Sequence, residues 1–289
     1  MFRINNLSND SGHIITEQKG IFSIIEHAVD FSVSPANALN EYFMSQMNVR
    51  RKQVIAQLNG KTGVTLQAGA MQWMTGDVHA TTGLKGVGDF IGKMVKSSIT
   101  KESAIKPEYV GAGILVTEPT YKYLLIENVA DWAGGLVMED GMFLACENTV
   151  KHEIQARSNL SSAALGHEGL FNLKLAGNGL CVLESNVPRS ELVEIVLDND
   201  VLKIDGSFAV CWSGSLKFTV ERSGTLLSAL LLPAKVLSTS IKEQVGYGLR
   251  RSLRPIHSLR QQITKRQNKK TSAVDTRAVS TAYCFKSPV

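Results

Sequence analysis

The sequence predicts an all-β protein whose body repeats one β unit three times about a pseudo-threefold axis, followed by an off-pattern C-terminal tail. Three observations support this prediction. Strand-like segments alternate with glycine turns, two glycine markers recur at nearly equal intervals, and strand patterning stops after Gly224. The chain has 289 residues, 44% of them hydrophobic and 20% charged, which is ordinary for a globular protein with a large core.

Residues 1–48 are expected to form a strand and a short helix that pack on the body. Residues 20–33 (GIFSIIEHAVDFSV) are rich in β-branched and aromatic side chains, which favours a strand. Ser34-Pro35 then places a helix cap before a proline at the first helical position. A helix over 36–47 follows from the three- to four-residue spacing of its large apolar residues, which are Leu39, Tyr42, Phe43 and Met47.

Residues 49–227 form the predicted repeated β domain. It opens with a strand in 49–58, a two-residue hairpin turn at Asn59-Gly60 and a partner strand in 62–67. Strands and turns follow almost throughout, so we expect residues 60–224 to be nearly all β.

Two glycine markers recur along this domain. The first marker follows a strand-like segment and precedes an alternating apolar face, and its copies are Gly69 (then Met71 and Trp73), Gly141 (then Phe143 and Ala145) and Gly206 (then Phe208 and Val210). The second is a Gly-x-Gly pair at 111–113 and again at 177–179. The two steps between the copies of the first marker and the one step between the copies of the second are nearly equal in length. Such a periodicity is typical of repeat architectures.

Residues 228–289 leave this pattern. The third copy should end in a Gly-Glu-Gly strand and a Gly-x-Gly corner, but the chain reads SALLLPAKVLSTSIKEQVGYGLRR. Synonymous codons exist for Ser228–Arg251 whose string, read from its third base, encodes GSAASGEGFVNVYKGTGRVWLAP. That text resembles GHEGLFNLKLAGNGLCVLES at 166–185 in the second copy.

We therefore predict a one-base shift of the reading frame near Leu227/Ser228. The tail after this point is expected to be poorly ordered and not to pack on the β body. The physical reason is its low apolar content, which cannot offset about 1–2 kcal/mol of backbone entropy per ordered residue.

The net charge of +5 is distributed unevenly along the chain. Residues 225–289 carry 12 Lys/Arg against 2 Asp/Glu, whereas residues 1–224 carry 19 against 24. An acidic body argues against nucleic acid as a partner, because affinity for phosphate comes largely from Lys and Arg. The basic segment 250–270 alone would indicate a nucleic-acid or anionic-lipid tail, but a frame shift accounts for it without any function.

The chain is expected to be cytoplasmic. Its first residues have neither a basic nor a long apolar region, so no signal peptide is predicted, and its apolar runs are too short to span a bilayer. The four cysteines show no CxxC pair, which favours reduced, buried thiols. The three tryptophans are expected in the core or in strand pairs rather than on a base-stacking surface.

The repeated strands, the Gly-Glu-Gly and Gly-x-Gly turns and the element VLKIDGSFAV at 201–210 resemble the altered-inheritance-of-mitochondria family of mitochondrial-biogenesis-like proteins. The resemblance covers residues 50–225 and the shifted-frame text. It implies an all-β body with a fold like the tryptophan RNA-binding attenuator protein, and it carries no catalytic motif.

Candidate catalytic or metal-binding residues are few. His152-Glu153 and His167-Glu168 are adjacent pairs, and neighbouring residues on a strand point to opposite faces. Glu147, His152 and His167 remain an alternative cluster that could meet across strands. No cysteine has an evident histidine partner, and no motif for nucleophilic catalysis is present. We therefore predict no enzyme activity and no catalytic, cofactor-binding or metal-binding residue.

Residues 83–92 are glycine-rich and are expected to form a mobile loop. The overlapping segment DFIGKMVK at 89–96 places Phe90, Ile91, Met94 and Val95 on one face of a short helix. This face is expected to cover an end of the β body, and a subunit contact or weak membrane-surface contact is the alternative.

The leading functional hypothesis is a non-enzymatic β scaffold, an assembly or interaction protein that forms a homo-oligomer or binds a protein partner. One alternative is RNA binding by analogy with the attenuator fold, which rests on fold alone. Another is a small-molecule-binding or metal-dependent enzyme in a β-barrel, which lacks a recognisable ligand set in the sequence.

Overall fold

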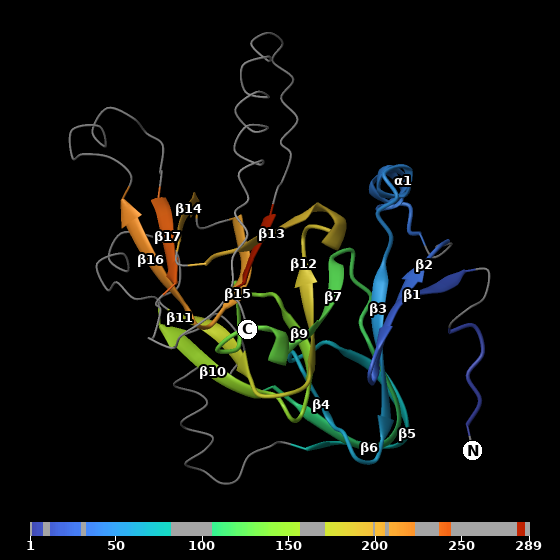
Figure 1. Cartoon of the computed structure of the whole chain (residues 1–289). Coiled ribbons are helices and arrows are strands. Elements are labelled where there is room, and N and C mark those ends of the chain that lie inside the picture. The colour runs from blue at the N-terminus through green and yellow to red at the C-terminus, as the bar shows by residue number, and fades with distance from the viewer. Residues whose placement is uncertain are drawn as a thin grey trace, which may run out of the picture. The chain divides into compact units, whose positions relative to one another are not determined.

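The structure is a computed structural model that describes residues 2–7, 12–29, 33–81, 106–156, 171–198, 200–205, 208–222, 237–243 and 282–286 (Figure 1). These residues form eighteen strands in three sheets, together with one α-helix and two short 3-10 helices. The prediction of an all-β protein is confirmed.

The largest sheet has nine strands. Its order is β1-β2-β3-β6-β4-β9-β12-β7, with β5 paired to β6 beside this path. Strand β3 contacts β7, the last strand of that order, so the sheet curls almost into a barrel (Figure 1). The strands are β1 (His13–Lys19), β2 (Phe22–His27), β3 (Lys52–Asn59), β4 (Val64–Leu66), β5 (Met71–Thr81), β6 (Glu108–Thr117), β7 (Tyr123–Asn128), β9 (Phe143–Glu147) and β12 (Leu180–Ser185).

The curled sheet encloses an apolar core. Eight of its nine strands contribute buried side chains to one cluster, which includes Phe22, Leu66, Leu115 and Val182. Full burial of one such side chain stabilises the fold by about 1.5–3 kcal/mol. The interior of this sheet is therefore a filled core.

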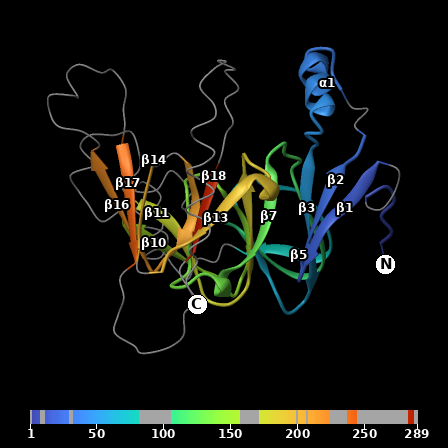
Figure 2. The same cartoon turned by 45° about the horizontal axis from the view of Figure 1, so that its top comes forward.

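Two smaller sheets complete the described structure. The second sheet has the order β10-β11-β8-β15-β18-β13, and the third has the order β14-β17-β16 (Figure 2). Their strands are β8 (Leu136–Met138), β10 (Lys151–Ala156), β11 (Phe171–Ala176), β13 (Leu192–Val196), β14 (Val201–Asp205), β15 (Ala209–Ser213), β16 (Leu216–Arg222), β17 (Leu237–Glu243) and β18 (Ala282–Lys286). A buried cluster that includes Trp132, Met138, Phe143 and Cys211 joins the second sheet to β7, β9 and β12.

The tryptophans lie largely where the sequence places them. Trp132 and Trp212 are buried in core clusters, and the half-buried Trp73 packs against a smaller cluster around Ile25 and Val116. These rings fill the protein interior.

The predicted hairpin at Asn59-Gly60 is wrong. Strands β3 and β4 both pair antiparallel with β6, β3 with residues 112–116 and β4 with residues 108–109. The turn at Gly60, which has φ +80°, therefore carries the chain from one part of β6 to another instead of folding β4 back onto β3.

Two glycines lie in β6 near the point where its pairing with β3 ends and its pairing with β4 begins. Gly111 and Gly113 have φ angles of +115° and +158°, in the region that favours glycine. A Cβ atom at Gly111 would lie only 1.8 Å from the carbonyl oxygen of Asp77 on β5. Glycine at this position therefore allows the backbone of β5 to approach the backbone of β6 closely.

The N-terminal region differs in detail from the expectation. The strand expected in 20–33 is β2, and a preceding strand, β1, pairs with it antiparallel although the sequence did not indicate it. The expected helix is α1 (Ala38–Gln46), but its N-cap residue is Asn37, so the predicted cap at Ser34-Pro35 is wrong. None of the helices in the described part of the chain has the length and apolar content needed to cross a bilayer.

The first glycine marker lies in turns where the structure describes it. Gly69 and Gly141 have φ angles of +82° and +79°, while Gly206 lies outside the described residues. Phe143 is buried on the expected face, but Phe208 is 40% exposed, so the predicted apolar face is wrong at that position. Phe208 lies just before β15, which begins at Ala209, so it is not one of the paired strand residues.

The expectation that the chain after Ser228 does not pack on the β body is also wrong for two segments. β17 pairs antiparallel with β14 and β16, and β18 pairs parallel with β13 and β15. The side chain of Cys284 on β18 is buried. Backbone pairing explains these contacts, because a strand can fill a sheet position through its N–H and C=O groups whatever its side chains are.

Candidate functional site

The structure describes two of the three residues of the candidate cluster of Glu147, His152 and His167. His152 lies on β10, where its ring packs edge-on against Phe143 with the centroids 5.1 Å apart. Glu147 instead accepts a hydrogen bond from the amide of Leu180 at 2.9 Å. His167 lies outside the described residues. In the part of the chain that the structure describes, no three His, Cys, Asp or Glu side chains are placed to hold a metal ion.

The structure reveals a cysteine–histidine contact that the sequence did not indicate. Cys146 Sγ lies 3.6 Å from His152 Nε2, across the turn between β9 and β10. Cys146 is fully buried, and this burial raises the pKa of its thiol well above the ordinary value. Because the thiolate is the reactive form of cysteine, this pair is not an activated nucleophile. All four cysteines are free and buried, as predicted.

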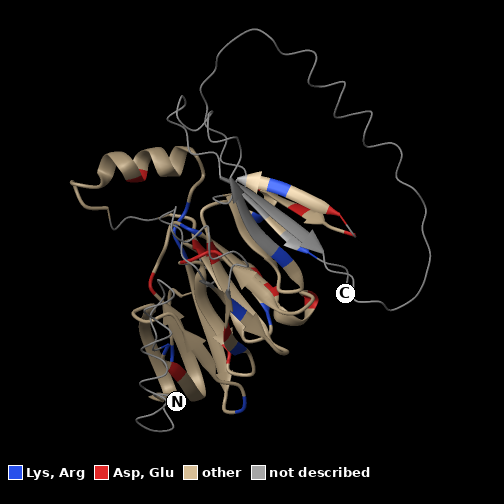
Figure 3. Cartoon of the chain, turned by 90° about the vertical axis from the view of Figure 1, so that its left-hand side faces the viewer, with Lys and Arg blue, Asp and Glu red and all other residues tan. Residues whose placement is uncertain are grey.

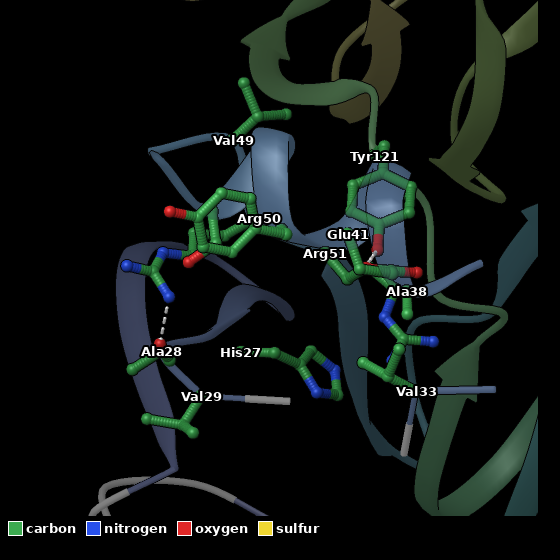
Figure 4. A pocket seen from close by; sticks show the side chains of 12 residues that line it. His27, Ala28, Val29, Val33, Ala38, Glu41, Val49, Arg50, Arg51 and Tyr121 are labelled. Atoms are coloured by element: carbon green, nitrogen blue, oxygen red, sulfur yellow. Dashed lines mark hydrogen bonds between the residues drawn. The ribbon is translucent and has the colours of Figure 1, made fainter. Parts of the chain in front are cut away.

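A pocket of about 490 Å³ lies between α1 and the adjacent end of the curled sheet. Its walls come from the end of β2, from α1, from the residues that lead into β3 and from Tyr121 (Figure 4). Arg50 donates a hydrogen bond to the carbonyl oxygen of Ala28, which ties the segment before β3 to the segment after β2. The pocket is therefore framed by polar contacts.

Tyr121 connects the body to α1. Its hydroxyl donates a hydrogen bond to Glu41 on the helix, and the guanidinium of Arg51 lies 6.0 Å from its ring centroid. Desolvation and then the Glu41 carboxylate raise the pKa of Tyr121 to about 12. The phenol therefore stays protonated at neutral pH, which keeps it a hydrogen-bond donor to the carboxylate.

His27 forms the floor of the same pocket. Its Nε2 atom lies 2.8 Å from Oε1 of Gln53. Its ring lies edge-on to the ring of His13, with the centroids 4.8 Å apart. Burial lowers the pKa of His27, and the neighbouring His13 and Arg51 lower it further, against the Gln53 hydrogen bond. The neutral imidazole is therefore favoured in the folded protein.

The helix above the pocket exposes most of its large apolar side chains. Glu41 turns towards the body and bonds Tyr121, whereas the large apolar side chains face solvent. We call these exposed side chains the α1 patch, and they are Leu39 (69% exposed), Tyr42 (59%), Phe43 (56%) and Met47 (77%). No residue of α1 is buried.

Two further exposed apolar residues lie near the α1 patch, in a pocket whose lining also includes the charged Arg50 and Arg51. Val29 and Val33 line the same pocket as Tyr42 and are themselves exposed (Figure 4). Glu41 is the single charged residue of α1, and it is engaged with Tyr121 (Figure 3). A cluster of exposed apolar side chains is a candidate contact site, because contiguous apolar patches on monomeric proteins are often functional.

The fold and this surface define an all-β protein with a curled sheet and an exposed apolar helix at its rim. Comparison with known proteins gives its family, because the Mitochondrial biogenesis AIM24 family matches residues 45–239. The chain belongs to this family, and the resemblance inferred from the turns and strands is confirmed.

Two relatives come from Streptococcus pyogenes. An uncharacterised protein of serotype M6 is 27% identical to this chain over 184 residues, which are 61% of this chain and 72% of the relative. The crystal structure of another protein of this species has 22% sequence identity and a TM-score of 0.49, and it covers 68% of this chain and 85% of that chain.

Sequence periodicity identified the residues of the α1 patch but did not indicate that they face solvent. The spacing of Leu39, Tyr42, Phe43 and Met47 predicted one apolar face, and an apolar face is normally packed inward. The signal that could have indicated the opposite was the single acidic residue among neutral ones, since Glu41 has the phenol of Tyr121 as its partner. The other predicted apolar face, Phe90, Ile91, Met94 and Val95, lies outside the described residues.

Proposed function

We propose that this chain is a non-enzymatic β scaffold that self-associates through the α1 patch. The observation that supports the proposal is that the four large apolar side chains of the α1 patch are 56–77% exposed, while the only charged side chain of α1 bonds Tyr121 on the body. Leaving these side chains in water forgoes burial worth about 25 cal/mol for each Å² of apolar surface. Association recovers this free energy.

A second copy of the chain is the partner that fits this surface. In a twofold interface the same patch lies on both sides, so a charge close to the twofold axis meets a like charge. The α1 patch avoids this repulsion because no charged side chain lies on its exposed face. A membrane-binding helix, by contrast, typically has Lys and Arg on its polar face, and α1 has neither.

The helix is held in place for such a contact. A nine-residue helix is marginal in water by itself, because nucleation is unfavourable and few hydrogen bonds follow. The Glu41–Tyr121 hydrogen bond and the contacts of the half-buried Met44 attach α1 to the body. A pre-positioned apolar face loses less conformational entropy when it associates.

Sedimentation velocity over a range of chain concentrations tests the proposal. The unmodified chain should show concentration-dependent association, and Phe43→Glu should weaken it at least tenfold because association would bury an unpaired carboxylate. Met74→Glu is the matched control, since Met74 is an exposed apolar residue on β5 and should leave association unchanged. A monomer at every concentration, or equal association of the two variants, would contradict the proposal.

A further inference from the structure

Strand β12 and strand β18 occupy related positions between their neighbours. β12 lies between β7 and β9 and is antiparallel to both. β18 lies between β13 and β15 and is parallel to both. The flanking strands follow one another in the chain in the same way, as β7-β8-β9 and as β13-β14-β15.

The preceding strands show the same correspondence without a reversal. β11 pairs antiparallel with β10 and β8, and β17 pairs antiparallel with β16 and β14. The two strand sets thus correspond, one after another, from β7 to β11 and from β13 to β17. They diverge only at the sixth strand, which is antiparallel in one set and parallel in the other.

The chain reaches the two positions by different routes. Only residues 177–179 connect β11 to β12, and Gly177 and Gly179 have φ angles of +103° and +154°. A much longer segment, 244–281, separates β17 from β18. Closing the longer segment costs more chain entropy, and parallel pairing is slightly weaker per residue. Filling this sheet position with β18 is therefore less favourable in free energy than filling it with a strand that follows a short antiparallel turn.

The predicted shift of the reading frame would place a strand of the expected type at this point. Its segment F-V-N-V-Y-K overlaps the codons of Val236 to Lys242, which is where β17 lies. The next residues of that frame, G-T-G-R-V-W-L-A, match the Gly-x-Gly corner at 177–179 and the strand β12 that follows it. The text has strand-forming residues with a corner of the same type and length as in the other set.

We propose that the position between β13 and β15 is an acceptor for an antiparallel strand of sequence G-R-V-W-L-A, and that β18 is a replaceable substitute for it. The acceptor offers backbone groups on both sides, as in recognition by strand addition. The sheet has an apolar floor on the face of Cys211, which is buried in the cluster that includes Met138 and Phe143. Cys284 of β18 meets this floor through Cys211, with the sulfur atoms 3.2 Å apart.

A labelled peptide T-G-R-V-W-L-A-P tests the acceptor by fluorescence anisotropy. Cys284→Pro in the full chain should weaken β18, because proline donates no backbone hydrogen bond in a strand. The peptide should bind this variant at least tenfold more tightly than the unmodified chain, and the reversed sequence P-A-L-W-V-R-G-T should not bind. Equal binding of the two peptides, or no binding by a variant that keeps its far-UV circular dichroism spectrum, overturns the proposal.

A second measurement needs no weakened variant. A frame-restored chain, with GSAASGEGFVNVYKGTGRVWLAP after Leu227, has its acceptor filled covalently by the antiparallel strand. It should melt at a higher temperature than the unmodified chain and should not bind the peptide. A melting temperature equal to or below that of the unmodified chain overturns the proposal.

Discussion

Strand β12 and helix α1 place their apolar side chains in opposite environments. In β12, Cys181, Val182 and Leu183 are fully buried, and the strand is paired on both edges. In α1 no residue is buried, and its largest apolar side chains are more than half exposed. Both segments carry an apolar pattern in the sequence, but only the apolar side chains of β12 are buried within the single chain.

The difference separates the residues that stabilise the folded chain from the residues that we propose for association between chains. Successive residues of β12 belong to two clusters, because Val182 faces the core inside the curled sheet and Leu183 faces the cluster beneath the second sheet. Substitutions in β12 should therefore alter folding. Substitutions in the α1 patch should alter association and leave the folding of one chain nearly unchanged.

The largest expected effect is in β12. Leu183→Ala should lower the free energy of unfolding by about 2–5 kcal/mol, because it removes a fully buried side chain and leaves a cavity. The matched substitution Leu39→Ala, at a position 69% exposed, should change it by less than about 0.5 kcal/mol. Urea unfolding of dilute chain measures both values, and a comparable loss in the two variants would remove the contrast between β12 and α1.

An intermediate effect is expected at the attachment of α1. Tyr121→Phe removes the donor to Glu41 and should cost about 1.5 kcal/mol, because the hydrogen bond is to a charged acceptor. Limited proteolysis should then cut α1 faster than in the unmodified chain. Tyr42→Phe is the control, since Tyr42 is 59% exposed in the α1 patch. Equal cleavage of both variants would show that the Tyr121 contact does not hold the helix.

The smallest expected effect is the pH dependence at His27. Burial lowers the pKa of His27 in the folded chain below its ordinary value of 6.5, so near this pH the unfolded chain binds more protons. The stability linked to His27 is therefore present above pH 6.5 and is lost as the pH falls below it. Urea unfolding at neutral and at acidic pH should show a smaller loss for His27→Gln. Equal losses in the two chains would show that His27 is not responsible.

The sequence predicted features that depend on local chemistry. Gly69 and Gly141 were expected in turns because only glycine adopts positive φ without strain, and the all-β class followed from such turns between short strands. The cores of β12 and β9 also follow from local apolar runs. Each of these features needs information from only a few neighbouring residues.

The features that were missed depend on distant parts of the chain. β3 and β4 look like a hairpin locally, but both pair with β6, which begins only at Glu108. The direction of the α1 face depends on Tyr121, which is far along the chain from Glu41. The Cys146–His152 contact was missed because its geometry comes from the turn between two strands.

Amide hydrogen exchange of α1 and β12, measured in dilute and in concentrated solutions of the chain, tests the central claim most directly. Exchange in α1 should slow as the concentration rises, because association covers the α1 patch, while exchange in β12 should stay the same because its protection comes from folding. In Phe43→Glu the α1 exchange should no longer depend on concentration. If α1 exchanges at the same rate at both concentrations in a chain that sediments as an oligomer, the chain associates through another surface and the account of α1 is contradicted.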